Sequence, residues 1–154
     1  MKLNQILCFF LAIILLAGCD DDLDFNEQLE VDKGIIEDYV ADQGLVGEWT
    51  ERGVFYTMEK EGTGTEYPTV TSSIEIIYEG TLMDGTVFDS SEGFPRTLIV
   101  YQLIQGWQEG ILKYKKGSKG TMIIPSGLAY GIRGRGSIPG NAVLRFEIEL
   151  LSFQ

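Results

Sequence analysis

Residues 144–150, Leu-Arg-Phe-Glu-Ile-Glu-Leu, decide the fold class, because apolar and charged side chains alternate through them without a break. Successive side chains of a β-strand point to opposite faces, so the alternation places all four apolar residues on one face. The charged residues Arg145, Glu147 and Glu149 would then lie on a wet face. One apolar and one wet face are typical of antiparallel sheets, whereas strands of parallel sheets are apolar throughout. We therefore predict an antiparallel sheet.

Two further strands are predicted upstream. Residues 74–79 also alternate, with Ile74, Ile76 and Tyr78 on the more deeply buried face. The Asp84-Gly85 pair that follows is a typical hairpin turn, because both residues tolerate the positive φ that a tight turn needs. Residues 121–124 predict another strand, which ends at a proline.

A short helix is predicted between these strands. Residues 101–114 carry apolar side chains at helical spacing, and two glycines, Gly106 and Gly110, keep the helix short. Residues 131–140 are rich in glycine and predict a long loop. The fold class is therefore α+β, with an antiparallel sheet that closes over one short helix.

A second, amphipathic helix is predicted in residues 26–43. Acidic side chains occupy one face, and apolar side chains recur on the other at helical spacing. Gly34 weakens this helix by up to about 1 kcal/mol relative to alanine. The pattern does not choose between packing on the domain and packing on a partner. The apolar positions are Val31, Ile35, Ile36, Tyr39 and Val40.

The amino terminus is typical of a secretory signal. Lys2 precedes an uncharged run, residues 6–18, which is shorter than the about 20 residues that a spanning helix needs. The run ends in Leu-Ala-Gly before Cys19, a pattern similar to the lipobox of bacterial lipoproteins. This resemblance implies cleavage before Cys19 and attachment of lipid to it. The alternative is a signal peptide with an incidental cysteine.

The acidic run Asp20-Asp21-Asp22 follows at once and predicts a solvated tether beside a membrane. Alternatively, it resembles the acidic motif that marks surface export of lipoproteins in some Bacteroidetes. The predicted organisation is a signal peptide at 1–18, a tether and amphipathic helix at 19–48, and a domain at 49–154. We expect a lipid-anchored protein of the cell envelope, at the outer membrane, with surface exposure if the export motif operates.

Composition excludes several classes of function. The chain has 154 residues, 12 basic and 23 acidic side chains and no histidine, which gives a net charge of −11. A nucleic-acid partner is excluded because phosphate binding needs a basic surface. Without histidine, the Ser-His-Asp and Cys-His arrangements and the commonest zinc ligand are absent. No glycine loop has dinucleotide or P-loop spacing, and no carboxylate pair suggests a glycosidase, so we expect no cofactor and no metal.

Four separated segments resemble the FKBP-type peptidyl-prolyl cis-trans isomerases and occur in that family's order. The resemblance covers about residues 54–154 and implies an antiparallel sheet of five to six strands around one short helix. It also implies an isomerase that acts on proline-containing polypeptides as a monomer and needs no cofactor. The segments are Ile-Tyr-Glu-Gly-Thr-Leu-Met-Asp-Gly-Thr-Val-Phe-Asp-Ser-Ser (77–91), Leu-Ile-Gln-Gly-Trp-Gln-Glu-Gly (103–110), Leu-Ala-Tyr-Gly (128–131) and Ile-Pro-Gly-Asn-Ala-Val-Leu-Arg-Phe-Glu-Ile-Glu-Leu-Leu (138–151).

The resemblance implies an apolar pocket where the sheet meets the short helix. Trp107 would form its floor and receive the proline ring, while Leu103 and Ile104 would complete the rim. Such a pocket needs neither a nucleophile nor an acid–base pair, which agrees with the missing histidine. Its aromatic walls would be Tyr78, Phe88 and Phe146.

The resemblance also implies the polar groups of the site. Asp89 would lie at the edge of the pocket and form a hydrogen bond near Tyr78. The hydroxyl of Tyr130 and the backbone N–H of Ile104 would hold substrate carbonyl groups.

Three positions depart from the family pattern. Arg96 stands where an aromatic wall residue is common, Ser137 precedes Ile138 in the loop that usually offers two apolar groups, and Gly140 replaces a frequent second proline. These changes open one wall, which predicts altered substrate preference or weak turnover. Arg96 would favour an acidic residue near the proline, unless it points into solvent.

Three functional hypotheses remain open at this point. The first is an active isomerase that assists the folding of envelope proteins. The second is a binding module of the same fold that grips partners or unfolded chains with little turnover. The third is an anchored structural protein in which the aromatic residues are merely core.

Overall fold

The computed structural model describes residues 24–154. The predicted signal peptide, Cys19 and the acidic run after it lie outside the described residues. Within residues 24–154, no helix combines the length and the apolar character that crossing a membrane requires.

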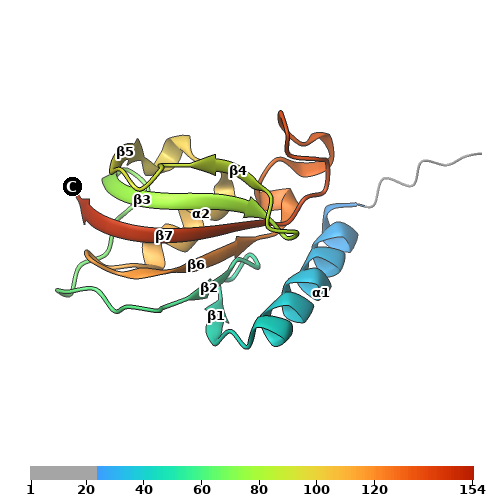
Figure 1. Ribbon diagram of the computed structural model, residues 1–154, viewed down its shortest axis with the longest axis horizontal. Coiled ribbons are helices and arrows are strands. Elements are labelled where there is room, and N and C mark those ends of the chain that lie inside the picture. Colours follow the sequence, from blue (N-terminus) through green and yellow to red (C-terminus); the bar gives the residue numbers. More distant parts are fainter. Residues whose placement is uncertain (1–23) are drawn as a thin grey trace, which may run out of the picture.

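The strands form one antiparallel sheet in the order β1-β2-β6-β7-β3-β4, and β5 pairs with β3 (Figure 1). The predicted antiparallel sheet is therefore confirmed. It has seven strands in the described chain where five to six were expected, since β1 and β2 have only three residues each and show no clear alternation. The strands are β1 (Gly47–Trp49), β2 (Phe55–Thr57), β3 (Ser73–Leu82), β4 (Val87–Ser90), β5 (Arg96–Ile99), β6 (Lys119–Ile124) and β7 (Leu144–Phe153).

The alternating stretch at 144–150 lies in β7, between β6 and β3. All four of its apolar side chains are buried in the main core, while Arg145, Glu147 and Glu149 on the other face are partly exposed. The predicted turn follows β3, where Gly85 has a φ of +87° and the Asp84 carboxylate accepts a hydrogen bond from the Thr86 N–H. The period-two patterns therefore place the central strands correctly.

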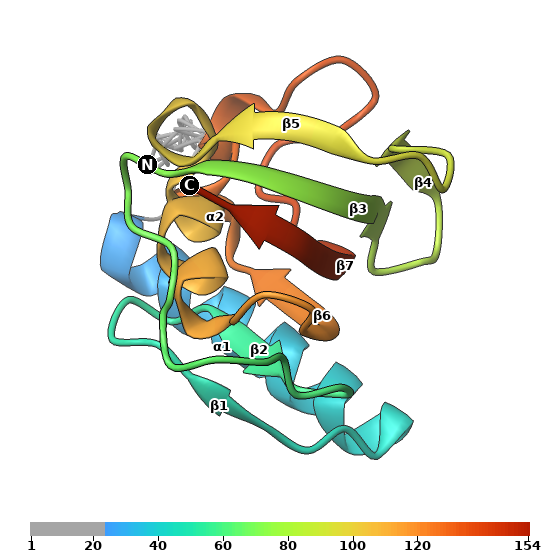
Figure 2. The same cartoon turned by 90° about the vertical axis from the view of Figure 1, so that its left-hand side faces the viewer.

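The predicted short helix is α2 (Gln105–Gly110), which lies against one face of the curved sheet (Figure 2). A Cβ atom added at Gly106 would lie 2.2 Å from Cγ2 of Ile124, so only glycine lets the helix sit this close to β6. The helix is flanked by two 3₁₀ turns, η1 (Val100–Gln102) and η2 (Ile111–Lys113). Because these turns are also helical, the apolar residues keep a helical spacing on both sides of α2.

The amino-terminal helix is α1 (Phe25–Gln43). The Asp24 carboxylate accepts hydrogen bonds from the backbone N–H groups of Asn26 and Glu27, which caps the start of the helix. The helix ends where Gly44 adopts a left-handed conformation with φ of +61°. Its Ile36 packs on the outer face of the sheet in a second buried cluster, so α1 packs on the domain. The cluster consists of Ile36, Phe55, Ile123 and Val143.

The buried face of α1 matches the apolar stripe in the sequence only in part. Val31 and Ile35 remain 48% and 40% exposed, whereas Asp32 is fully buried. The reason is a specific partner, because the Asp32 carboxylate accepts hydrogen bonds of 2.7 Å from both the N–H and the hydroxyl of Ser126. The side-chain amide of Gln28 donates a third bond, of 2.8 Å. A polar contact therefore sets the rotation of α1 about its own axis, and the spacing of apolar residues does not predict this contact.

The connection from β6 to β7 is the predicted long loop, and it contains two 3₁₀ turns, η3 (Ser126–Leu128) and η4 (Gly131–Arg133). Its tip is closed by paired backbone hydrogen bonds between Arg135 and Ile138, of 2.9 and 3.0 Å. This pairing fixes the conformation of the loop tip.

Candidate active site

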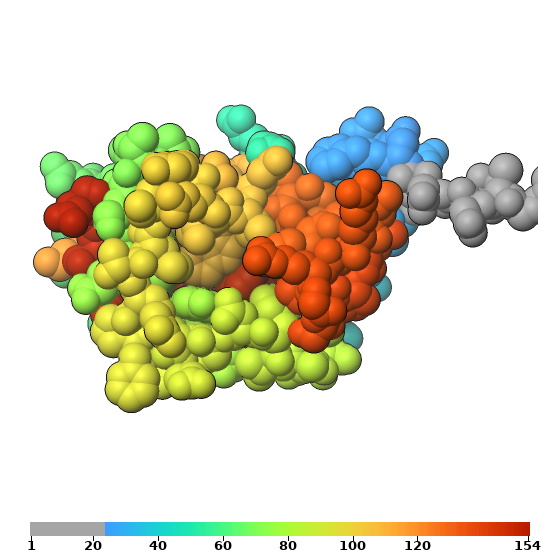
Figure 3. All heavy atoms as spheres, turned by 90° about the horizontal axis from the view of Figure 1, so that it is seen from above, coloured from blue at the N-terminus to red at the C-terminus, as the bar shows by residue number. Residues whose placement is uncertain are grey.

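A cavity of about 250 Å³ opens between the sheet, the start of α2 and the loop from β6 to β7. Figure 3 shows the hollow, bordered by the yellow-green and yellow segments on one side and the orange segment on the other. Aromatic and aliphatic side chains dominate its lining. The lining residues are Tyr78, Phe88, Asp89, Leu98, Gln102, Leu103, Ile104, Trp107, Tyr130, Arg135 and Phe146.

Trp107 lies at the base of this cavity. It is only 4% exposed, and its ring packs edge to face against Tyr78 and Phe146, with centroid distances of 5.6 and 5.2 Å. Trp107 follows Gly106, the residue that lets α2 approach β6 closely. The glycine contact and the two aromatic contacts together fix the indole.

Phe88 and Phe146 form the adjoining wall. Their rings pack edge to face at a centroid distance of 5.5 Å. They cover Gly80 of β3, where an added Cβ would lie 2.8 Å from atoms of both rings. Glycine at this position therefore makes room for the aromatic pair.

Tyr78 and Asp89 supply a polar edge to the apolar wall. The Tyr78 hydroxyl donates a hydrogen bond of 3.0 Å to the Asp89 carboxylate. Burial, together with this hydrogen bond and the negative charge of Asp89, raises the pKa of Tyr78 to about 12. The phenol therefore stays protonated and continues to donate at neutral pH.

The turn before α2 presents a second polar group to the cavity. The side-chain amide of Gln108 donates to the carbonyl of Leu103 at 2.7 Å and so holds the turn in place. The Ile104 carbonyl accepts the first hydrogen bonds of α2, from Trp107 and Gln108. Within residues 24–154, the Ile104 N–H itself donates to no protein acceptor. It remains available to a ligand in the cavity.

The sequence model of the FKBP-type peptidyl-prolyl cis-trans isomerases matches residues 64–151. The chain belongs to this family. FkpA of Aeromonas hydrophila is 50% identical over 107 residues, which are 68% of this chain and 40% of that protein. FK506-binding protein 1 of Dictyostelium discoideum is 44% identical over 107 residues, which cover 66% of this chain and 99% of that protein.

Solved structures of the FKBP family share the fold. The crystal structure of FkpA from Escherichia coli superposes with a TM-score of 0.73 at 34% identity, over 84% of this chain and 60% of that chain. A peptidyl-prolyl cis-trans isomerase from Pseudomonas syringae gives 0.71 at 30% identity, over 86% and 98%. The chain spans less than half the length of the FkpA proteins from Aeromonas, Buchnera and Neisseria.

The structure of this FKBP-family chain brings most of the predicted site residues to one cavity. Arg96 and Ile138 are the two that do not line it. Arg96 is exposed on β5, and Ile138 is 8% exposed within the main core, behind the loop tip. The eight residues that line the cavity are Tyr78, Phe88, Asp89, Leu103, Ile104, Trp107, Tyr130 and Phe146.

Three lining residues were not predicted. Leu98 and Gln102 come from β5 and η1, two short elements without a clear periodic pattern. Arg135 comes from the glycine-rich loop, and its guanidinium lies 5.6 Å from the ring centroid of Tyr130. Only the position of Arg135 five residues after Tyr130 links it to the site in the sequence.

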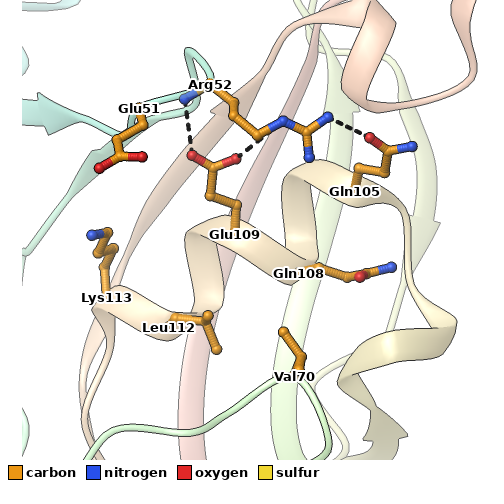
Figure 4. A pocket seen from close by; sticks show the side chains of 8 residues that line it. All are labelled: Glu51, Arg52, Val70, Gln105, Gln108, Glu109, Leu112 and Lys113. Atoms are coloured by element: carbon orange, nitrogen blue, oxygen red, sulfur yellow. Dashed lines mark hydrogen bonds and ion pairs between the residues drawn. The ribbon is translucent and has the colours of Figure 1, made fainter.

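A larger cleft, of about 390 Å³, lies beside the face of α2 that carries Gln105 and Gln108 (Figure 4). Its lining is mainly charged or amide-bearing, and no aromatic side chain belongs to it. Arg52 occupies this cleft, with its backbone N–H donating to Glu109 at 3.0 Å and its guanidinium donating to Gln105. These contacts give the cleft a structural role in joining the β1–β2 turn to α2.

Proposed function

We propose that the chain is a peptidyl-prolyl cis-trans isomerase that accelerates rotation about X–Pro bonds. The single observation that supports this most strongly is the cavity above Trp107, which joins aromatic walls to hydrogen-bond donors at its edge. Membership of the isomerase family supports the same reaction. The proposed substrates are proline-containing polypeptides.

The proposed mechanism follows from the electronic structure of the amide. Resonance gives the C–N bond partial double-bond character, which sets a rotation barrier of ~18–20 kcal/mol. The twisted transition state loses this resonance, so its carbonyl is less polar than that of the planar amide. An apolar cavity removes the water that stabilises the planar form. Because the twisted form is then favoured relative to the ground state, the rotation is faster without a covalent step.

Each site residue predicted from the sequence has a proposed role. Trp107 is the floor for the pyrrolidine ring, and the aromatic walls and aliphatic rim exclude water. The Tyr130 hydroxyl and the Ile104 N–H donate hydrogen bonds to substrate carbonyls. Asp89 orients Tyr78, and Arg96 and Ile138 act at the margin of the substrate site. The walls and rim are Tyr78, Phe88, Phe146 and Leu103.

A binding module of the same fold with little turnover is the second candidate. It is favoured by Arg96, whose long charged side chain stands where the family commonly has an aromatic wall residue. Such a module would bind proline peptides at the same cavity without accelerating their isomerisation. Turnover therefore distinguishes the two candidates.

The test is a proline-peptide isomerisation assay on the full chain purified in detergent. We expect the parent to accelerate the reaction and Asp89→Val to lower kcat/KM roughly tenfold, because a hydrogen bond to a charged group contributes about 1.5–3 kcal/mol. Trp107→Phe should also lower it, since the smaller ring leaves part of the floor open. Glu66→Val, at an exposed loop carboxylate, is the matched control and should retain the parent rate.

Each outcome of this assay has a clear meaning. Peptide binding without rate acceleration by the parent would favour the binding module. Equal rates for the parent, Asp89→Val and Trp107→Phe would show that the assigned residues do not form the site.

We also propose that the protein is a monomeric lipoprotein of the cell envelope. The support is the lipobox-like sequence before Cys19 and the resemblance of the domain to FkpA proteins. The proposed segments are the signal at 1–18, the tether and α1 at 19–48, and the isomerase domain at 49–154. Metabolic labelling with a fatty acid should mark the parent and not Cys19→Ser. Digestion of the protein by protease added to intact cells would establish surface exposure.

A further inference from the structure

One arginine lines the cavity, and a second lies on a strand that contributes to its lining. Arg135 lines the cavity from the loop that follows β6, and its guanidinium stacks near the ring of Tyr130 at 5.6 Å. Arg96 is on β5, the strand that contributes Leu98 to the lining. Within residues 24–154, neither arginine forms an ion pair with a carboxylate.

The backbone of Arg135 is held firmly in place. Its N–H donates to the Ile138 carbonyl at 2.9 Å, and the Ile138 N–H donates back at 3.0 Å. Gly134 adopts a φ of +62° just before it, and an added Cβ there would lie 2.2 Å from the Ile138 carbonyl oxygen. The closed turn thus fixes the backbone from which the Arg135 side chain extends over the Tyr130 ring.

Arg96 lies on the cavity face of the sheet. It pairs with Ile76 of β3, whose side chain is buried in the main core, and paired residues share a face. Two residues further along the same face, Leu98 lines the cavity. The positive charge of Arg96 lowers the pKa of Tyr78, against the larger effects of burial and of Asp89. The side chain therefore lies near the Tyr78 phenol.

The lining of the cavity carries no excess of negative charge, although the chain is strongly acidic. In the described chain, Asp89 is the sole carboxylate among the lining residues, and it already accepts the Tyr78 hydrogen bond. Within the lining, Arg135 balances the charge of Asp89, and Arg96 beside the cavity adds a further positive charge near Tyr78. The chain as a whole carries −11. The cavity therefore differs in charge from the rest of the molecule.

We propose that Arg135, with Arg96, selects substrates that carry an acidic side chain directly beside the proline. Guanidinium groups bind carboxylates through two parallel hydrogen bonds, and a guanidinium that has no protein carboxylate retains these donors for a substrate. This proposal rests on the proposed isomerase function and specifies its substrate class.

The test compares matched peptides that differ only in charge, using the full chain purified in detergent. One pair has Glu or Gln before proline, and the other has Glu or Gln after it. We expect a kcat/KM ratio of Glu to Gln of roughly two- to fivefold in at least one pair, the range that a partly exposed ion pair supports. Arg135→Gln should bring the ratio close to one, and Arg135→Lys should keep part of it.

Arg133→Gln is the matched control, because Arg133 is an exposed arginine of the same loop and does not line the cavity. This variant should keep the parent ratio. Raising the salt concentration should lower the ratio in the parent, since ion pairs near the surface are screened. Arg96→Gln alone should lower the ratio by less than Arg135→Gln does.

The assay distinguishes failure of the proposed preference for acidic substrates from failure of the proposed isomerase function. Equal rates for Glu and Gln peptides in both pairs, or a ratio that Arg135→Gln leaves unchanged, would overturn the preference and leave the function intact. If no peptide is isomerised, the proposed function fails. Calorimetric affinities for the same peptides then decide the preference, since equal affinities for Glu and Gln peptides overturn it.

Discussion

The hydrogen bond from Tyr78 to Asp89 joins an apolar wall to a charge at the edge of the site. The phenol ring packs on Trp107 at 5.6 Å, and the hydroxyl lies 3.0 Å from the carboxylate. Burial disfavours the phenolate, and a neighbouring carboxylate disfavours it further. The result is a pKa of about 12 for Tyr78, so its proton is retained throughout the physiological range.

Replacing Asp89 by Asn tests this account of Tyr78. The amide oxygen still accepts a hydrogen bond, but the negative charge is lost, so the pKa of Tyr78 should fall from about 12 towards 10 without reaching it. The ultraviolet absorbance of tyrosinate should show one tyrosine titrating earlier in the variant. Tyr78→Phe removes that titration and identifies it. An identical curve for Asp89→Asn would mean that burial alone sets the pKa.

The site residues differ in how well they can be predicted from the sequence. Tyr78, Trp107 and Phe146 stand within clear periodic patterns and within motifs that resemble the family. Leu98 reaches the cavity only through the register of β5 on β3, which alternation within four residues does not specify. Arg135 reaches it through the backbone pairing of a glycine-rich loop. Periodicity can be predicted from the local sequence, whereas pairing between distant segments cannot.

At the scale of elements, α1 packs against the segment that connects β6 to Tyr130 of the site. The buried Asp32 carboxylate accepts two hydrogen bonds from Ser126, and the Phe25 ring lies where a Cβ on Gly127 would meet it at 2.6 Å. Ser126 and Gly127 begin η3, which ends at Leu128, two residues before Tyr130. The helix therefore supports the turn from which the Tyr130 side chain extends.

Asp32→Ala should destabilise the protein by about 3 kcal/mol, because it leaves the buried N–H and hydroxyl of Ser126 without an acceptor. Urea unfolding followed by circular dichroism measures the change. Asp38→Ala, at an exposed position of the same helix, is the control and should cost less than about 0.5 kcal/mol.

A double-mutant cycle with Ser126→Ala isolates the contact. The effect of Ser126→Ala should be large in the parent and small in the Asp32→Ala background, since the hydroxyl has then already lost its partner. Additive effects would show that Asp32 and Ser126 act independently. The existence of α1 follows from its sequence, but the face it buries follows only in part. Asp32 orients the helix, but the sequence alone would place this acidic residue on the solvated face.

At the scale of the whole molecule, the composition of the chain limits how the reaction rate can depend on pH. The chain has no histidine, the side chain whose ordinary pKa lies in that range. The cavity holds one carboxylate, one arginine and two tyrosines, and Tyr78 has a pKa raised to about 12. The proposed mechanism needs no proton transfer. The molecule is therefore suited to a reaction whose rate does not depend on pH.

We accordingly expect kcat/KM to stay within about twofold between pH 5 and 8, because the chain has no histidine and the proposed mechanism involves no general acid or base whose titration would bend the profile. Above pH 10 the rate should fall towards pH 12, as loss of the Tyr78 proton would place a second negative charge beside Asp89. The raised pKa also stabilises the fold fully below about pH 10, the unfolded value, and this contribution is lost as the pH rises through about 12. Circular dichroism at each pH separates the two effects, since a rate loss that precedes unfolding belongs to the site. A bell-shaped profile with both limbs between pH 5 and 8 would require acid–base chemistry and would contradict catalysis by desolvation alone.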